Sequence, residues 1–285
     1  MSDFPYKTVG IVAKPGYPGF EELVSQIASW LQQRGSRLIC EDPIPGVIQV
    51  GKEELERQSE MILVMGGDGT FLAGGRISLT RNLPILGVNL GHLGFLTEIT
   101  VEELFRALQK IHEGKVHFET RHLLQTRIKK NNDVLYEGHV INDAVITKSA
   151  ISRMLEIETR VNGSFLALFK ADGLIISTPT GSTAYSLAAG GPIVFPTMEA
   201  IVMTPICAHS LNQRPLVIPD NLKISVHIQK SADNVTLTLD GQTGKNLQSD
   251  EYVEIVKSPY HLNIIKSPFK NYFEILKSKL RWAEA

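Results

Sequence analysis

A glycine-rich turn with one acidic residue is the first feature of this sequence that could carry chemistry. The buried-strand pattern Met61 to Met65 runs directly into Gly66 to Thr70, Gly-Gly-Asp-Gly-Thr, and a helical pattern follows. Glycines let backbone N–H groups approach phosphate oxygens closely, and the start of the helix adds a partial positive charge. A carboxylate suits a hydroxyl group or a metal ion better than a phosphate, so Asp68 indicates a second ligand at this turn.

The same turn has a purely structural interpretation. Asp68 would then cap the helix, and the glycines would only make a tight connection between strand and helix. Short glycine motifs recur by chance, so other parts of the sequence must decide between the two interpretations.

A second polar run extends from Asp172 to Pro192. It combines a strand pattern, a hydroxyl-rich turn and a short helical stretch that is closed by glycines. Six serine and threonine residues lie between Ser177 and Ser186. Each buried hydroxyl must find a partner or cost stability, so this density favours a polar ligand over packing. The alternative is a solvated turn with ordinary caps.

Together the two runs resemble motifs of the NAD kinase family. In that family a Gly-Gly-Asp-Gly-Thr turn is followed later in the chain by Thr-Pro-Thr-Gly-Ser-Thr-Ala-Tyr-Ser, which stands here at Thr178 to Ser186. The similarity includes Asn89 to Leu96, the pair Asn142-Asp143 and the run Pro205 to Pro215, and it covers residues 60 to 245. One departure is Ala208, where the family pattern has proline.

The resemblance implies a role for each matching residue. Asp68 would orient the adenosine 2′-hydroxyl of NAD and accept its proton, and Gly66, Gly67 and Gly69 would shape the turn that meets the ATP phosphates. Asn142 and Asp143 would hold the adenine edge and a ribose hydroxyl, although a strand bulge or turn is the alternative for this pair. The other residues expected to bind nucleotide are Phe95, Arg153, Lys170, Asp172, Thr183, Ala184, Tyr185, Ser186, Leu187, Ala188 and Gln242.

The activity that the resemblance implies is transfer of a phosphoryl group from ATP to the 2′-hydroxyl of the adenosine ribose of NAD, which gives NADP. Lys170 indicates ATP rather than polyphosphate as the donor. Mg²⁺, or another divalent cation, is expected with ATP. No dedicated protein metal site is expected, because Mg²⁺ keeps several waters and uses substrate oxygens. The resemblance also implies a homo-oligomer, namely a homotetramer.

Two other functions stay open at this point. Lipid kinases of the diacylglycerol type share the Gly-Gly-Asp-Gly-Thr turn, but an acyl chain calls for an apolar groove and the run Thr178 to Ser186 is polar. A non-catalytic dinucleotide sensor could use the same pocket, but Asp68 would then have little purpose.

Composition limits the remaining classes of function. The 285 residues carry a formal net charge of −1 with both signs scattered, so no sustained basic face for nucleic acid or anionic membrane is expected. No apolar run approaches the roughly 20 residues that span a bilayer, and the N-terminus lacks a signal pattern, which predicts a cytoplasmic protein. Cys40 and Cys207 lack the spacing of a metal site or redox pair.

The elements that must position these residues fall into two kinds, which predicts an α/β protein. The first third alternates strand and helix patterns, so we expect an N-terminal Rossmann-like domain with a parallel sheet. Thr100 and Glu103 form a predicted capping box for a helix that ends at Gly114. The expected strands are 9–13, 37–40, 61–65 and 84–88, and the first helix is 20–31.

From about residue 120 the pattern predicts a mostly β domain. Asn162-Gly163 is typical of a hairpin turn between strands. We expect domains at residues 1–118 and 119–267, and a C-terminal segment, 268–285, whose helix 273–282 docks on the first domain. The expected strands are 123–128, 134–146, 155–161, 165–169, 222–229, 235–239, 252–257 and 262–265.

Overall fold

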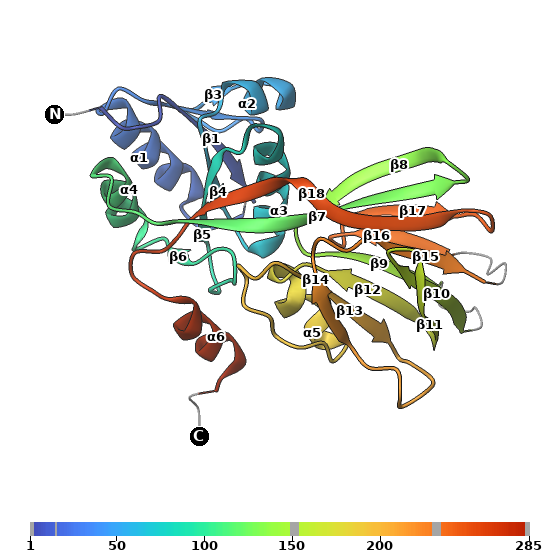
Figure 1. Cartoon of the computed structure of the whole chain (residues 1–285). Coiled ribbons are helices and arrows are strands. Elements are labelled where there is room, and N and C mark those ends of the chain that lie inside the picture. Colours follow the sequence, from blue (N-terminus) through green and yellow to red (C-terminus); the bar gives the residue numbers. More distant parts are fainter. Residues whose placement is uncertain (1–2, 15, 149–153, 230–234, 283–285) are drawn as a thin grey trace. The chain divides into compact units, whose positions relative to one another are not determined.

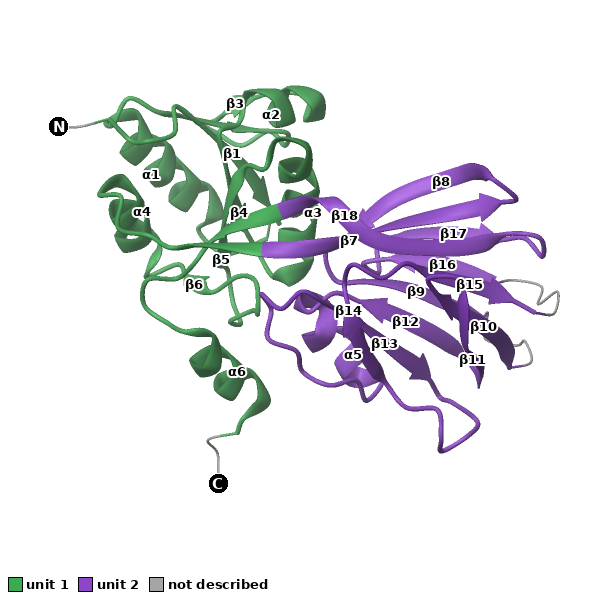
Figure 2. Cartoon of the chain, in the orientation of Figure 1, with its two compact units in different colours: residues 1–120, 262–285 green, residues 121–261 purple. Residues whose placement is uncertain are grey.

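The computed structural model describes residues 3–14, 16–148, 154–229 and 235–282. The chain divides into two compact units (Figure 2): unit 1, residues 1–120 with 262–285, and unit 2, residues 121–261. The boundary within the last part of the chain lies between residues 261 and 262, whereas the sequence placed it after residue 267. The C-terminal segment 268–285 is part of unit 1.

Unit 1 is built on a parallel sheet whose strands alternate with helices along the chain (Figure 1). Its described strands pair in parallel, for example Ile11 with Leu63 and Leu63 with Leu86. This confirms the predicted Rossmann-like arrangement. The strands are β1 (Thr8–Ala13), β2 (Arg37–Cys40), β3 (Ile48–Gln49), β4 (Met61–Met65), β5 (Pro84–Asn89) and β6 (Ile99–Thr100). The helices are α1 (Phe20–Gln32), α2 (Lys52–Gln58), α3 (Asp68–Ser78), η1 (Leu79–Arg81), α4 (Leu104–His112) and α6 (Tyr272–Leu280).

The glycine turn lies between the most buried strand of unit 1 and helix α3. All five residues of β4 are buried, as expected for a central strand that is covered on both faces. Helix α3 packs closely on this strand, because a Cβ at Gly74 would lie 2.5 Å from the Val64 side chain. The close packing fixes where α3 begins relative to the end of β4.

The predicted capping box is only half present. The Glu103 carboxylate accepts a hydrogen bond from the Thr100 backbone N–H at 3.0 Å, but helix α4 begins at Leu104, after a turn at residues 101–103. The predicted helix start was therefore wrong by one turn. At the other end Gly114, with φ +67°, has the left-handed backbone that ends a helix.

In the part of unit 2 that the structure describes, two groups of antiparallel strands form a sandwich, and two short helices accompany them. Buried side chains from both groups form one core, for example Ile157 and Val226 from one group and Ile176 and Leu237 from the other. The first group contains β8 (Asp133–Val140), β10 (Leu155–Val161), β11 (Ser164–Ala171), β15 (Ile224–Ile228) and the parts of β7 (Phe118–Lys130) and β18 (Tyr252–Ile265) that lie within residues 121–261. The second contains β9 (Asp143–Lys148), β12 (Gly173–Ser177), β13 (Ala200–Ile206), β14 (Leu216–Pro219), β16 (Val235–Leu239) and β17 (Thr243–Leu247), and the helices are η2 (Thr180–Thr183) and α5 (Tyr185–Ala188).

Several strand predictions for unit 2 need correction. The predicted strand 134–146 is two strands, β8 and β9, which separate at Ile141 and Asn142 and enter different sheets. The predicted strands 252–257 and 262–265 are one continuous strand, β18. Strands β13, β14 and β17 were not predicted. The hairpin at Asn162-Gly163 is confirmed, with φ of +49° and +82°.

Candidate functional site

The Asp68 carboxylate holds the loop that follows β5. Oδ2 accepts a hydrogen bond from the backbone N–H of Phe95 at 2.9 Å, and Oδ1 accepts from those of Leu96 and Thr97 at 3.0 and 3.2 Å. The Thr97 hydroxyl donates to Oδ1 at 3.3 Å. A carboxylate offers about four lone-pair sites, and three of these bonds fall on Oδ1, so Oδ2 keeps capacity for one more donor. Helix α3 begins at Asp68, but this side chain caps a neighbouring loop rather than its own helix.

Gly94 allows this close approach, and Gly66 leaves room for Thr70 within the glycine turn. A Cβ on Gly94 would lie 2.1 Å from Asp68 Oδ1 and 2.4 Å from the Thr97 hydroxyl. A Cβ on Gly66 would lie 2.4 Å from the Thr70 hydroxyl. A larger residue at either position would displace the side chain it meets, so the glycines decide where Asp68 and the turn lie.

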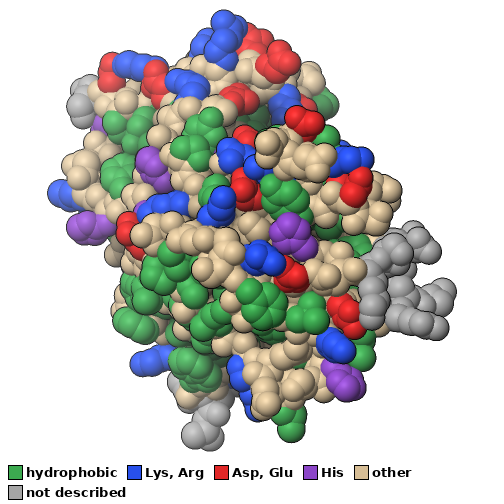
Figure 3. Space-filling model, turned by 45° about the vertical axis from the view of Figure 1, so that its right-hand side comes forward, with side chains coloured by type: hydrophobic (Ala, Val, Ile, Leu, Met, Phe, Trp, Pro, Cys, Tyr) green, Lys and Arg blue, Asp and Glu red, His purple; other side chains and the backbone are tan. Residues whose placement is uncertain are grey.

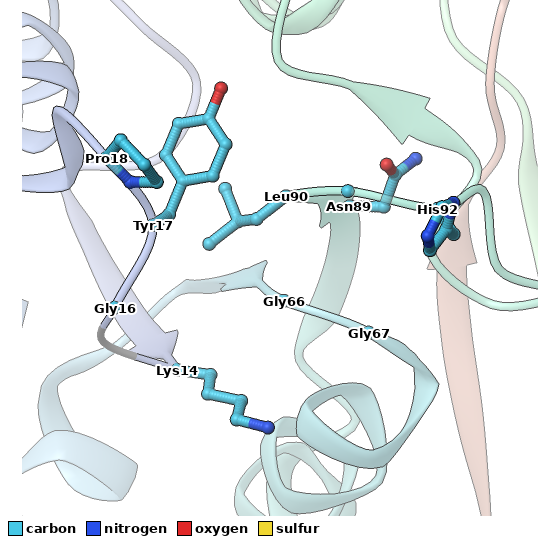
Figure 4. A pocket seen from close by; sticks show the side chains of 10 residues that line it. Lys14, Gly16, Tyr17, Pro18, Gly66, Gly67, Asn89, Leu90 and His92 are labelled. Carbon is cyan, nitrogen blue, oxygen red and sulfur yellow. The ribbon is translucent and has the colours of Figure 1, made fainter.

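A cavity of about 370 Å³ opens at the carboxyl ends of β1, β4 and β5 (Figure 4). Ligands of open α/β sheets bind at this edge. Gly66 and Gly67 line the cavity, as the sequence predicted for a phosphate-binding turn, while Lys14, Tyr17 and His92 are lining residues that it missed. Apart from Gly66 and Gly67, none of the described residues that line the cavity was predicted as a site residue. The described lining residues are Lys14, Gly16, Tyr17, Pro18, Gly66, Gly67, Asn89, Leu90, Gly91 and His92.

In unit 2 the backbone between β8 and β9 is held by the carboxylate of Asp240. This carboxylate accepts hydrogen bonds from the backbone N–H groups of Ile141, Asn142 and Asp143 at 2.7 to 3.2 Å. The Asp240 backbone N–H donates in return to the Asp143 carbonyl oxygen at 2.9 Å. These bonds explain why the predicted single strand breaks at Asn142.

The carboxyl group of Asp143 is in a different environment. The residue is only 4% exposed, and no hydrogen bond joins its carboxyl to another described residue. Burial, together with the negative charge of Asp240, raises the pKa of Asp143 to about 7. Asp143 therefore exchanges a proton near neutral pH, and its neutral form can donate a hydrogen bond to a ligand.

Asn142 and Asp143 line a cavity of about 380 Å³ in unit 2. Ala184 and Tyr185, predicted from the second polar run, line the same cavity, so the structure brings these two motifs together. Thr183, Ser186, Leu187 and Ala188 lie on the same η2 and α5 segment, but they are not lining residues. The residues that the sequence missed are Val145, Thr147, Thr238, Asp240 and Gly241.

Most buried hydroxyls of the second polar run have partners within the protein, whereas the buried Thr180 hydroxyl has no hydrogen-bond partner among the described residues. Thr178 donates to the Ile141 carbonyl oxygen at 2.6 Å, and Ser186 bonds Thr204 at 2.9 Å. Gly181 lies so close to Asn142 that a Cβ would meet its carbonyl oxygen at 2.2 Å. Thr178 holds the polar run against the start of β9, and Ser186 holds it against β13, so the density of hydroxyls does not by itself indicate a ligand.

The remaining predicted residues lie in varied surroundings. Asp172 pairs with Lys148 at 2.9 Å, and Lys170 lies 3.5 Å from Glu156. The Lys279 ammonium lies over the Phe95 ring, 5.7 Å from its centroid. Gln242 is in the turn after β16, where its N–H donates to Leu239. Gly69 lies in the first turn of α3, and Arg153 is outside the described residues.

The described surface and side chains set limits on ligand type. On the face drawn in Figure 3, basic and acidic side chains are interspersed rather than gathered by sign. Within the described ranges, no group of three or more His, Cys, Asp or Glu residues could hold a metal ion. Helices long and apolar enough to cross a bilayer do not occur in those ranges.

Comparison with known proteins gives matches over most of the chain. Residues 9–116 match a model of the ATP-NAD kinase N-terminal domain, and residues 141–267 match that of the ATP-NAD kinase C-terminal domain. An NAD kinase of Solibacter usitatus is 41% identical over 282 residues, which cover 98% of each chain. An NAD kinase of Trichlorobacter lovleyi is 42% identical over 283 residues, which cover 98% of this chain and 99% of its own.

Two solved structures are similar to this one. A crystal structure of yeast NADH kinase complexed with NADH has a TM-score of 0.90 at 26% identity, and the match covers 99% of this chain and 89% of the yeast chain. A crystal structure of an NAD kinase from Archaeoglobus fulgidus in complex with ATP has a TM-score of 0.76 at 27% identity, with coverage of 96% and 98%.

Proposed function

The chain belongs to the NAD kinase family, and we propose that it transfers the γ-phosphoryl group of ATP to the 2′-hydroxyl of the adenosine ribose of NAD. The products are NADP and ADP. The observation that carries this proposal is the Asp68 carboxylate at the glycine turn, since it leaves Oδ2 with capacity for one hydroxyl donor. The names of the relatives and of the two solved structures support the choice of NAD and ATP.

The reaction makes one bond and breaks one. A bond forms between the ribose 2′-oxygen and the γ-phosphorus, and the bond from that phosphorus to the β–γ bridging oxygen breaks, with its electron pair leaving on ADP. The hydroxyl proton passes to Asp68 and then to solvent. Because phosphoryl transfer commonly has a loose transition state, orienting the hydroxyl matters more than removing its proton early. The four bonds that fix Asp68 suit that orienting role.

The acceptor NAD is assigned to the unit 2 cavity. Asn142 and Asp143 offer an amide and a carboxyl group for an adenine edge or ribose hydroxyls, and Tyr185 adds an aromatic surface. For the other candidate residues, a role in nucleotide binding stays a prediction from the family resemblance. These residues are Phe95, Arg153, Lys170, Asp172, Gln242 and the residues of η2 and α5 that do not line the cavity.

The donor phosphates are assigned to the cavity beside Gly66 and Gly67. Mg²⁺, or another divalent cation, would enter with ATP and neutralise part of the phosphate charge. The cation would be held through the phosphate oxygens of ATP and through water, because Mg²⁺ keeps several waters and uses substrate oxygens.

We also propose a cytoplasmic homo-oligomer, a homotetramer. Strands β11 and β14 lie at sheet edges, and both carry exposed apolar side chains. These are Phe165 and Leu168 on β11, and Leu216 and Val217 on β14. Apolar side chains on sheet edges favour pairing with another chain. Light scattering coupled to gel filtration would give the mass, and a single-chain mass of 31.5 kDa would contradict the assembly.

One assay separates this function from its alternatives. The protein is incubated with ATP, Mg²⁺ and either NAD or diacylglycerol, and NADP and phosphatidate are measured. NADP from NAD alone supports the proposal, and phosphatidate would support a lipid kinase. Binding of NAD without NADP formation would support a non-catalytic sensor.

A further inference from the structure

Lys14 lies beside the glycine turn because of the strand pairing in unit 1. Its backbone N–H donates to the Met65 carbonyl oxygen at 3.0 Å, which extends the parallel pairing of β1 and β4 one step beyond Ala13 and Met65. Met65 directly precedes Gly66, so this bond fixes the Lys14 backbone next to the turn. Figure 4 shows the Lys14 side chain reaching from the end of β1 in the direction of α3.

The charge of Lys14 is available to a ligand. Lys14 is the one lysine or arginine among the residues that line the unit 1 cavity, and those residues include no carboxylate. No ion pair joins Lys14 to another described residue. A lysine ammonium is a compact charge with three donors, which suits the oxygens of a phosphate group.

A cation beside the glycine turn would strengthen its hold on an anionic ligand. Asp68 brings a negative charge to within two residues of Gly66, and like charges at short range repel. The described residues contain no side-chain cluster suited to a bound metal. The lysine or arginine of the lining that can offset the charge of a polyphosphate is therefore Lys14.

We infer that Lys14 binds the triphosphate of the phosphoryl donor in the unit 1 cavity, an inference that rests on the proposed kinase function. The occupant is a nucleoside triphosphate, held through its phosphate oxygens. The diphosphate of the acceptor NAD does not contact Lys14.

The test compares Lys14→Met and Lys14→Arg with the wild-type protein. The control is Lys52→Met, which removes an exposed lysine of unit 1 that is not a lining residue of the cavity. Kinetics give KM for ATP and for NAD, and calorimetry gives Kd for ATP, for inorganic tripolyphosphate and for NAD. Thermal unfolding of each variant checks that the fold is kept.

Loss of one charge-assisted hydrogen bond corresponds to about a tenfold or larger loss of affinity. Lys14→Met should therefore raise KM for ATP and Kd for tripolyphosphate by about tenfold or more, with KM for NAD unchanged. Lys14→Arg should restore most of the affinity, and Lys52→Met should match the wild type. The loss caused by Lys14→Met should shrink at high salt, because salt screens exposed charges.

Two results would overturn the inference. In one, Lys14→Met leaves the affinity for ATP and tripolyphosphate unchanged. In the other, it weakens NAD instead of ATP, which would place the lysine on the acceptor. If the wild type forms no NADP, the proposed kinase function is rejected instead. The binding of tripolyphosphate to Lys14→Met and to the wild type would still test whether Lys14 binds phosphate.

Discussion

The Asp240 carboxylate accepts a hydrogen bond from the backbone N–H of Asp143, while the Asp143 carboxyl lies buried beside it without a hydrogen-bond partner among the described residues. Two acidic groups at one cavity thus have opposite environments. Three backbone N–H groups stabilise the charge of Asp240, whereas burial and that same charge disfavour ionisation of Asp143. A carboxyl that keeps its proton near neutral pH can donate a hydrogen bond as well as accept one.

The first prediction concerns stability and pH. The pKa of Asp143 is raised in the folded protein from 3.8 to about 7, so the folded state holds a proton that the unfolded state releases between these values. Stability should therefore fall as pH rises through this window and level off above it. Asp143→Asn should remove this fall, which is on the order of 2 to 4 kcal/mol. Urea unfolding of both proteins from pH 4 to 8 measures the difference, and parallel curves would contradict the raised pKa.

The second prediction concerns Asp240 itself. Asp240→Ala leaves the backbone N–H groups of Ile141, Asn142 and Asp143, of which the first and last are buried, without their acceptor, and should destabilise the protein by roughly 2 to 4 kcal/mol. The control Asp250→Ala removes an exposed carboxylate that pairs with Lys130, and should change the stability far less, because solvent screens an exposed ion pair. Chemical unfolding at pH 7 gives both values. If Asp240→Ala and Asp250→Ala lower the free energy of unfolding equally, the hydrogen bonds of Asp240 contribute little to stability.

The third prediction concerns the role of Asp68 in turnover. Asp68→Asn keeps the size of the side chain but removes the carboxylate that orients the substrate hydroxyl, so kcat should fall about 10²- to 10⁴-fold. NAD binding in the unit 2 cavity should persist. Thr97→Val removes the longest bond to Asp68, 3.3 Å, and should change kcat by less than about tenfold. Rates come from NADP formation, and near wild-type turnover by the asparagine variant would remove Asp68 from the reaction.

The fourth prediction concerns the space that Gly94 provides. Gly94→Ala places a methyl group 2.1 Å from Asp68 Oδ1, so the carboxylate must move away from the Phe95 to Thr97 loop. We expect kcat to fall by about 100-fold, because a displacement near 1 Å at a reacting group can cost that much. Gly51→Ala meets no atom within 4 Å and should keep full activity. Should both variants be fully active, the close contact at Gly94 would have no part in catalysis.

Sequence reasoning was most successful where a feature is local. The order of strands and helices in unit 1 follows from short apolar patterns, and the hairpin at Asn162-Gly163 follows from two adjacent residues. The edges of elements were less certain, as at α4, where Glu103 accepts from Thr100 but the helix begins one turn later. There the local signal is real, because the Glu103 bond to Thr100 is present, but it does not set the residue at which the helix begins.

The sequence by itself determined the family, the glycine turn and most candidate site residues, because these depend on which residues occur in which order. Only the tertiary structure decided which of them meet. Asp240 reaches the backbone of Asn142, 98 positions away, and Lys14 lies beside Gly66 through parallel strand pairing. The tertiary structure also showed that buried hydroxyls such as that of Ser186 form hydrogen bonds with residues elsewhere in the chain. Such contacts join residues distant in the chain, so no local pattern records them.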